Sequence, residues 1–205
     1  MPLAEPFTPW PWDIDLMLKL NFDGGPVMDF LMYWISDIPI WIPFYLVLIW
    51  MIWRRFGWKQ ALAFVACALI MLFFVETVST FFKQNLSKFR PTHYLPLEEL
   101  LHTVKGYKGG LYGTVSAHAG NTLGFTILTS LIIRRRWFTI MMACWCLAVS
   151  YSRIYLGMHY PADIMFGFIN GAIWGALAWL LYRFVTGKIA RRSAVRADER
   201  SQTRP

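Results

Sequence analysis

The chain has 205 residues, of which 57% are hydrophobic and 16% are charged. Soluble domains average about 45–50% apolar and about 25% charged residues, so this composition excludes a disordered protein and disfavours an ordinary soluble enzyme. The formal net charge of +8 invites comparison with nucleic-acid-binding proteins, but the basic residues fall in short runs between apolar stretches, the pattern of membrane topology signals. We therefore expect a protein of the membrane bilayer that binds no nucleic acid.

Residues 1–37 are expected to form a separate N-terminal element. The segment 10–22 mixes Trp and Leu with Asp in the manner of an interfacial helix, and Gly24-Gly25-Pro26 separates it from an apolar stretch at 26–37. That stretch rises only about 18 Å as a helix, whereas the hydrocarbon core of a bilayer is about 30 Å thick. The element is therefore predicted to be interfacial or half-crossing, and the alternative is a sixth full span.

Five nearly charge-free stretches follow and predict an all-α fold, a polytopic transmembrane helix bundle over residues 38–187. A span needs about 20 mostly apolar residues, and Lys or Arg at the end of a shorter stretch can reach the interface. The third span is expected to begin inside its window, near Ser116. The predicted spans are 38–53, 60–82, 109–133, 137–152 and 164–182.

Basic residues separate these spans in a regular alternation, which orients the bundle. They lie between the first two spans, between the third and fourth, and after the fifth, where residues 188–205 form a basic tail that we expect to be disordered. Because Lys and Arg are enriched in cytoplasmic loops, these sites are assigned to the cytoplasm, and residues 83–115 and 153–163 to the opposite, outer face. The basic residues are Arg54, Arg55 and Lys59; Arg134, Arg135 and Arg136; and Arg183, Lys188, Arg191, Arg192, Arg196, Arg200 and Arg204.

Nearly all the unusual polar residues gather on that outer face. Ionisable side chains are costly at membrane depth, so their placement indicates where function lies. Lys83, Arg90 and Arg153 are permanent cations, and the guanidinium fork of arginine matches phosphate oxygens. Ser116 adds a hydroxyl at the start of the third span, where free backbone N–H groups also favour an anion. Each residue alone has an ordinary structural explanation, but together they predict a phosphate-binding site.

Two histidines adjoin this site in the sequence. His118 and His159 can supply the nucleophile and the proton donor that phosphoryl transfer needs when no metal takes part. Asp163 follows His159 by four residues, so on a helix its carboxylate reaches the imidazole and orients the ring. The alternative for His118 is a satisfied polar residue in a helix bundle. For Glu76, within the second span, we expect a structural hydrogen bond or a polar contact rather than catalysis.

The order and spacing of these residues resemble the motifs of the type-2 phosphatidic acid phosphatase superfamily, which includes bacterial membrane lipid phosphatases. The first motif, Lys-x6-Arg-Pro, appears as KQNLSKFRP at 83–91, and the third, Ser-Arg-x5-His-x3-Asp, as SRIYLGMHYPAD at 152–163. The second, usually Pro-Ser-Gly-His, appears as VSAH, with Val115 for proline and Ala117 for glycine. Alanine disfavours positive φ, but a helical φ suits it, so we expect this departure to be tolerated.

The resemblance implies a metal-independent hydrolase that needs no cofactor and works through a phosphohistidine. His159, oriented by Asp163, would attack phosphorus, and His118 would protonate the leaving oxygen before water releases the phosphate. The phosphate would be held by Lys83, Arg90, Ser116, the backbone amide of Ala117, and Arg153.

We therefore predict a lipid phosphatase in the bacterial inner membrane, with its active site at the periplasmic or exterior face. A bundle in the bilayer favours a substrate with a lipid tail, and family analogy favours a polyprenyl pyrophosphate or a lipid A phosphate over phosphatidylglycerol phosphate or phosphatidate. Two alternatives stay open: a phosphotransferase that hands the phosphate to a second lipid, and a non-enzymatic transporter or scaffold. The sequence predicts no particular oligomeric state.

Overall fold

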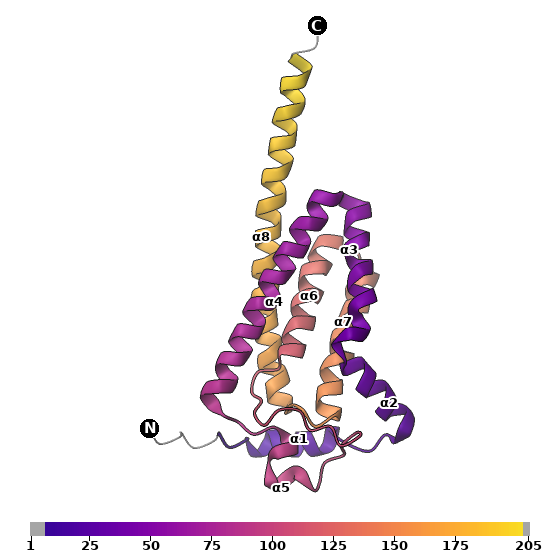
Figure 1. The fold of residues 1–205 in the computed structure, drawn as a ribbon, viewed down its shortest axis with the longest axis vertical. Coiled ribbons are helices and arrows are strands. Elements are labelled where there is room, and N and C mark those ends of the chain that lie inside the picture. Colours follow the sequence, from indigo (N-terminus) through magenta and orange to yellow (C-terminus); the bar gives the residue numbers. More distant parts are fainter. Residues whose placement is uncertain (1–6, 203–205) are drawn as a thin grey trace.

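Helices make up most of the computed structural model, which describes residues 7–202, with side chains to residue 192 (Figure 1). No strand forms in that part of the chain, so the predicted all-α class is confirmed. The helices are α1 (Pro11–Leu20), α2 (Gly25–Ser36), α3 (Ile42–Phe56), α4 (Trp58–Leu86), α5 (Leu95–Glu98), α6 (Ala117–Ile133), α7 (Arg136–Tyr155) and α8 (Pro161–Gln202), with 3-10 turns η1 (Ile38–Trp41) and η2 (Pro91–His93).

Four stretches are long and apolar enough to cross a membrane, and they cover four of the five predicted spans. They are Ile38–Phe56, Trp58–Leu86, Arg136–Tyr155 and Pro161–Arg192. The remaining predicted span, the third in chain order, is α6, which has 17 residues and is shorter than these four. It begins at Ala117 because residues 109–116 belong to the loop between α4 and α6 (residues 87–116, the α4–α6 loop). α6 packs against α4, α7 and α8, so the short helix lies inside the bundle (Figure 1).

α6 and α8 pack with their backbones in contact. A Cβ added to Gly171 of α8 would lie 2.2 Å from the carbonyl oxygen of Gly120 in α6. Small residues allow helices in membranes to approach this closely. The contact also aligns the first turns of the two helices, because the backbone N–H of Ser116 donates to the carbonyl of Asp163 at 3.0 Å. Two predicted site residues are therefore held together by main-chain packing.

The N-terminal element forms two short helices at one end of the bundle (Figure 1). α1 lies across that end and buries Asp13 and Met17, while α2 packs beside α7. The side chain of Asn21 fixes the junction between them, since it accepts the N–H of His102 at 2.8 Å and donates to the carbonyl of Tyr155 at 2.7 Å. Neither helix is long enough to cross a bilayer alone.

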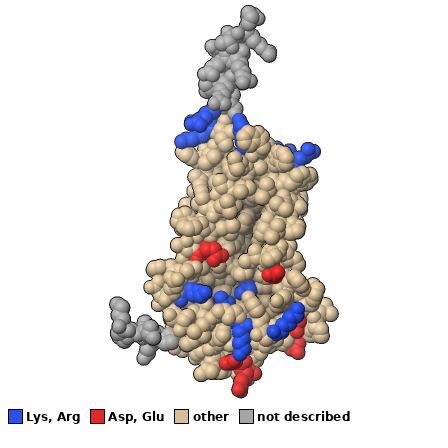
Figure 2. Space-filling view, in the orientation of Figure 1, with Lys and Arg blue, Asp and Glu red and all other residues tan. Residues whose placement is uncertain are grey.

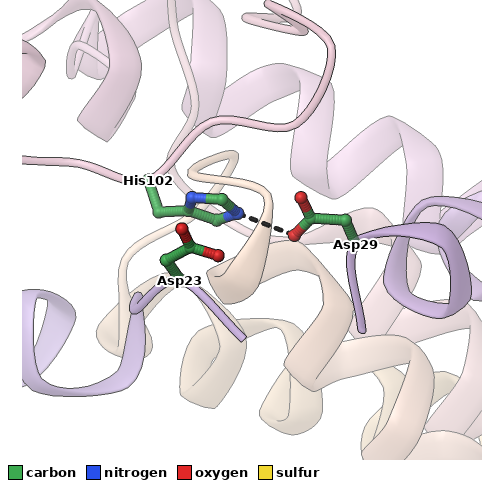
Figure 3. Close-up of side chains that lie close together, drawn as sticks. All are labelled: Asp23, Asp29 and His102. Atoms are coloured by element: carbon green, nitrogen blue, oxygen red, sulfur yellow. Dashed lines mark hydrogen bonds and ion pairs between the residues drawn. The ribbon is translucent and has the colours of Figure 1, made fainter. Parts of the chain in front are cut away.

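A second contact joins α2 to the α4–α6 loop (Figure 3). Nε2 of His102 lies 2.7 Å from Oδ1 of Asp29, and the hydroxyl of Tyr155 donates to the same oxygen at 2.5 Å. Asp23, from the junction between α1 and α2, points its carboxylate toward this pair. The hydrogen bond from Tyr155 is the main cause of the lowered pKa of Asp29. α2, the loop and the end of α7 are thus tied together where the predicted site residues lie.

The basic connections lie at the opposite end of the bundle from these contacts. The α3–α4 turn, the α6–α7 turn and the later part of α8 share that end in Figure 1. Figure 2 shows Lys and Arg toward both ends of the visible face, with a belt free of them between.

The expectation of a disordered tail is wrong over residues 188–202, because α8 continues as a helix to Gln202 and neither glycine nor proline interrupts that stretch. Residues 203–205 lie outside the described part of the chain.

We expect Gly171→Ala to destabilise the bundle, because the added methyl group would collide with backbone that can move only if α6 separates from α8. Overpacking of this kind costs about 1–3 kcal/mol. Thermal unfolding in detergent should report a lower midpoint. The matched control is Gly187→Ala on the same helix, where a Cβ would meet nothing within 4 Å. It should be neutral or slightly stabilising, and equal midpoints for the two variants would contradict the close packing.

Candidate active site

The predicted catalytic pair lies at the junction of α7 and α8. His159 precedes α8 and Asp163 lies in its first turn, so Nδ1 of the imidazole is 3.3 Å from Oδ2 of the carboxylate. The same oxygen accepts the backbone N–H of Tyr160 at 3.1 Å. Both side chains are buried. The backbone fixes the carboxylate, and the carboxylate orients the ring, which leaves Nε2 as the nitrogen available for chemistry.

The surroundings of His159 favour its neutral form. Burial lowers the pKa of His159 well below the ordinary histidine value, and the positive charges of Arg90 and Arg153 lower it further. Because the pKa in the folded protein is depressed, the imidazole stays neutral to a lower pH than a free histidine. A neutral imidazole is the form that can act as a nucleophile.

Arg153 brings a buried cation to this pair from the last turn of α7. One of its terminal nitrogens, Nη1, donates to the hydroxyl of Ser36 at the end of α2. Its Nε is also buried and has no hydrogen-bond partner among the described residues. Unsatisfied buried donors are uncommon in proteins, and an arginine donor without a partner is suited to an anion.

Arg90 approaches from the α4–α6 loop, which folds closely over it. Nε of Arg90 donates to the carbonyl of Tyr112 at 3.1 Å. Gly109 has a φ of +62°, and a Cβ there would lie 3.3 Å from Nη1 of Arg90. Lys83 is more peripheral: it is exposed near the end of α4, and its effect on the pKa of His159 is smaller than that of Arg90. The structure thus brings Arg90 close to His159 and leaves Lys83 at the edge of the candidate site.

The second motif forms the start of α6. Ser116 is the N-cap, and its Oγ accepts the N–H of Ala119 at 3.4 Å. Ala117 is the first helical residue and is not among the residues with positive φ, so its methyl group fits where the usual motif has glycine. The first amides of a helix have no partner within it, which makes those of Ala117 and His118 suitable for an anion. The His118 side chain interacts electrostatically with His159.

His118 lies where two cavities meet. An apolar cavity of about 420 Å³ runs between α3, α4, α6 and α7, and a more polar pocket of about 270 Å³ lies beside α2 and the α4–α6 loop. His118, Ser36 and Ile38 line both of them. Glu76 lines the apolar cavity and accepts from Nδ2 of Asn121 at 2.8 Å, which is the structural hydrogen bond expected for this residue. Other residues that line the apolar cavity are Trp41, Tyr45, Phe64, Leu72, Phe125 and Val149.

Two buried charged residues join the site that the sequence analysis did not assign to it. Nζ of Lys88 donates to Oδ1 of Asp163 at 2.8 Å and lies 3.3 Å from Oδ2 of Asp13 on α1. The other oxygen of Asp13 accepts the N–H of Ala162 at 2.8 Å. Lys88 had a signal in the sequence, because it is a second cation two residues before Arg90 inside the first motif. Asp13 had no such signal in the sequence, because its partner Lys88 is 75 residues away.

Residues 60–186 match the family model of the PAP2 superfamily. The lipid A 4'-phosphatase of Bacteroides thetaiotaomicron is 35% identical over 184 residues, which cover 88% of this chain and 80% of that protein. The lipid A 4'-phosphatase of Porphyromonas gingivalis is 31% identical, covering 85% and 74%. The undecaprenyl-diphosphatase of Sulfolobus acidocaldarius is 26% identical, covering 78% and 74%.

Two solved structures share the fold. The crystal structure of Aquifex aeolicus LpxE superimposes with a TM-score of 0.63 at 17% identity, covering 84% of this chain and 98% of that one. The PAP2-type phosphatidylglycerolphosphate phosphatase of Bacillus subtilis gives 0.61 at 15% identity, covering 88% and 85%. With the family model and the curated relatives, these findings establish that the chain belongs to the PAP2 superfamily and is a bacterial membrane lipid phosphatase.

Proposed function

We propose that the protein removes a phosphate group from a lipid A-type glycolipid at the outer face of the inner membrane, through a phosphohistidine on His159. The observation that carries this proposal is the position of His118, which interacts with His159 and lines both the apolar cavity and the polar pocket. A phosphate held between the two histidines has an apolar space on one side for an acyl tail. It has a polar space on the other side for a head group.

The chain's own residues supply every role in the reaction. Arg90, Arg153 and the start of α6 bind the phosphate and neutralise its oxygens. Nε2 of His159 attacks phosphorus, and the bond to the lipid oxygen breaks with its electron pair on that oxygen, which takes a proton from His118. Water then attacks the phosphohistidine and gives a proton back to His118 while the N–P bond breaks. Inorganic phosphate leaves, and both histidines return to their starting state.

The polar pocket supports a sugar head group. Tyr33, Asp37 and Tyr107 line it together with Arg153. Aromatic rings present an apolar face with a polar edge, and a carboxylate accepts hydrogen bonds from hydroxyl groups, so the pocket suits the phosphorylated sugar of lipid A. The two lipid A 4'-phosphatase relatives point the same way. A polyprenyl pyrophosphate has no group beyond its phosphates to occupy this pocket. It remains the second candidate because of the undecaprenyl-diphosphatase relative.

The proposed orientation rests on the basic connections. They lie at the end of the bundle opposite the site (Figure 1), and Lys and Arg are enriched in the cytoplasmic loops of membrane proteins. The candidate active site is therefore assigned to the periplasmic side, where lipid head groups of the outer leaflet can reach it.

Purified protein in detergent should release inorganic phosphate faster from lipid A than from undecaprenyl pyrophosphate, phosphatidylglycerol phosphate or phosphatidate. A phosphate assay measures the rate, and mass spectrometry identifies the lipid product. His159→Ala serves as the inactive control. A fastest rate with undecaprenyl pyrophosphate would replace lipid A by the second candidate. A phosphorylated second lipid without free phosphate would instead reveal a phosphotransferase.

The orientation can be tested by cysteine labelling in intact cells, after Cys67, Cys144 and Cys146 are replaced by alanine. Glu99→Cys, exposed in the α4–α6 loop, should react with a membrane-impermeant maleimide. Arg136→Cys, exposed at the start of α7, should react only after the membrane is permeabilised. The reverse labelling pattern would place the site in the cytoplasm and remove the case for periplasmic substrates.

The two histidines should respond differently to the leaving group. His159→Ala should abolish turnover of every substrate, because no nucleophile remains. His118→Ala should slow hydrolysis of a lipid monoester by about 10²–10⁴-fold, the usual value of general acid catalysis. It should cost much less with p-nitrophenyl phosphate, whose nitrophenolate leaves without a proton. Equal losses in both variants on p-nitrophenyl phosphate would show that the roles are wrongly assigned.

A further inference from the structure

Four side chains form one continuous buried set of contacts behind the nucleophile. Asp13 lies 3.3 Å from the ammonium of Lys88, Lys88 lies 2.8 Å from Asp163, and Asp163 lies 3.3 Å from the imidazole of His159. The exposed fractions are 0% for Asp13, 3% for Lys88, 2% for Asp163 and 5% for His159. With so little water among them, their charges act on one another more strongly than they would at the surface.

The Lys88 side chain is almost fully buried, and its ammonium is surrounded by aromatic rings. It lies 4.3 Å from the ring centre of Tyr160, 5.8 Å from that of Trp10 and 5.9 Å from that of Phe7. Aromatic faces attract cations, so these rings and the two carboxylates enclose the positive charge. If Asp163 were its only acidic partner, Lys88 would neutralise the carboxylate that orients His159.

Asp13 changes this balance of charge. With both carboxylates ionised, Asp13, Lys88 and Asp163 carry one net negative charge next to the imidazole. The remaining nearby charges are positive: Arg90, Arg153 and Lys83 all disfavour a cationic His159. These cations suit the phosphate, but they oppose the positive charge that the ring acquires when Nε2 bonds to phosphorus while Nδ1 keeps its proton.

We infer that Asp13 is a positioning residue for phosphoryl transfer: by sharing the charge of Lys88, it leaves a net negative charge beside His159 that stabilises the cationic phosphohistidine. This inference rests on the proposed mechanism. Asp13 also fixes the position of that charge, because it accepts the N–H of Ala162 in the first turn of α8, the turn that carries Asp163. α1, which lies outside the long helices of the bundle, thereby acts in the chemistry through Lys88 and Asp163.

The test is a double-mutant cycle on net charge, assayed at mildly alkaline pH where both carboxylates are ionised. Asp13→Asn leaves the group neutral, and kcat should fall by about tenfold, less than the loss of about 10²–10³ for a donor that touches the reacting atoms. Adding Lys88→Met to Asp13→Asn restores one net negative charge. The double variant should therefore be at least about threefold more active than Asp13→Asn alone, as expected for coupled neighbours.

A purely structural role predicts the opposite result, because each substitution then removes a contact and the losses accumulate. A double variant that is no more active than Asp13→Asn would overturn the inference. Thermal unfolding in detergent checks that each variant is folded, and a second double variant with Lys88→Gln covers the case in which methionine prevents folding. Asp15→Asn, the same change at an exposed position of α1, is the control and should leave kcat unchanged.

The activity of the wild type separates failure of the proposed function from failure of this inference. An inactive wild type on every lipid would overturn the proposed function and this inference with it. An active wild type whose double variant shows accumulated losses would overturn the inference alone.

Discussion

A buried ammonium group must be paired, and the pairing of Lys88 organises this end of the molecule. Removing one partner from a buried ion pair costs about 3–5 kcal/mol, because the remaining charge has no water to stabilise it. Lys88 meets this requirement with Asp13 from α1 and Asp163 from α8. It thereby joins three parts of the chain that are far apart in sequence. The position of α1 across the bundle and the orientation of His159 follow from the same interaction.

The site combines two electrostatic environments around one imidazole ring, that of His159. Arg90 and Arg153 bring positive charge to His159, and the buried Nε of Arg153 has no hydrogen-bond partner among the described residues. The acidic pair around Lys88 forms the other environment. Main-chain contact between α6 and α8 holds the start of α6 beside the acidic pair, because the N–H of Ser116 donates to the carbonyl of Asp163.

The sequence predicted the features that depend on local spacing. His159 and Asp163 are four residues apart, and one helical turn brings their side chains together wherever that turn lies. Asp13 could not be predicted, because its contact with Lys88 depends on how α1 lies across the bundle, which no local pattern encodes. The predicted start of the third span near Ser116 is confirmed, since Ser116 is the N-cap of α6. Lys88 rather than Lys83 is buried because α4 ends at Leu86 and the chain then turns inward.

The placement of Asp13 in α1 also bears on how the enzyme is assembled during synthesis. Asp13 is made first, Lys88 follows 75 residues later, and Asp163 arrives only with the last long helix. Until the first turn of α8 is made, an incomplete chain lacks the second carboxylate that Lys88 requires. Before that point, Asp13 is the one acidic partner of Lys88 among the described residues that has been made. The first turn of α8 then supplies both the carboxylate of Asp163 to Lys88 and the N–H of Ala162 to Asp13.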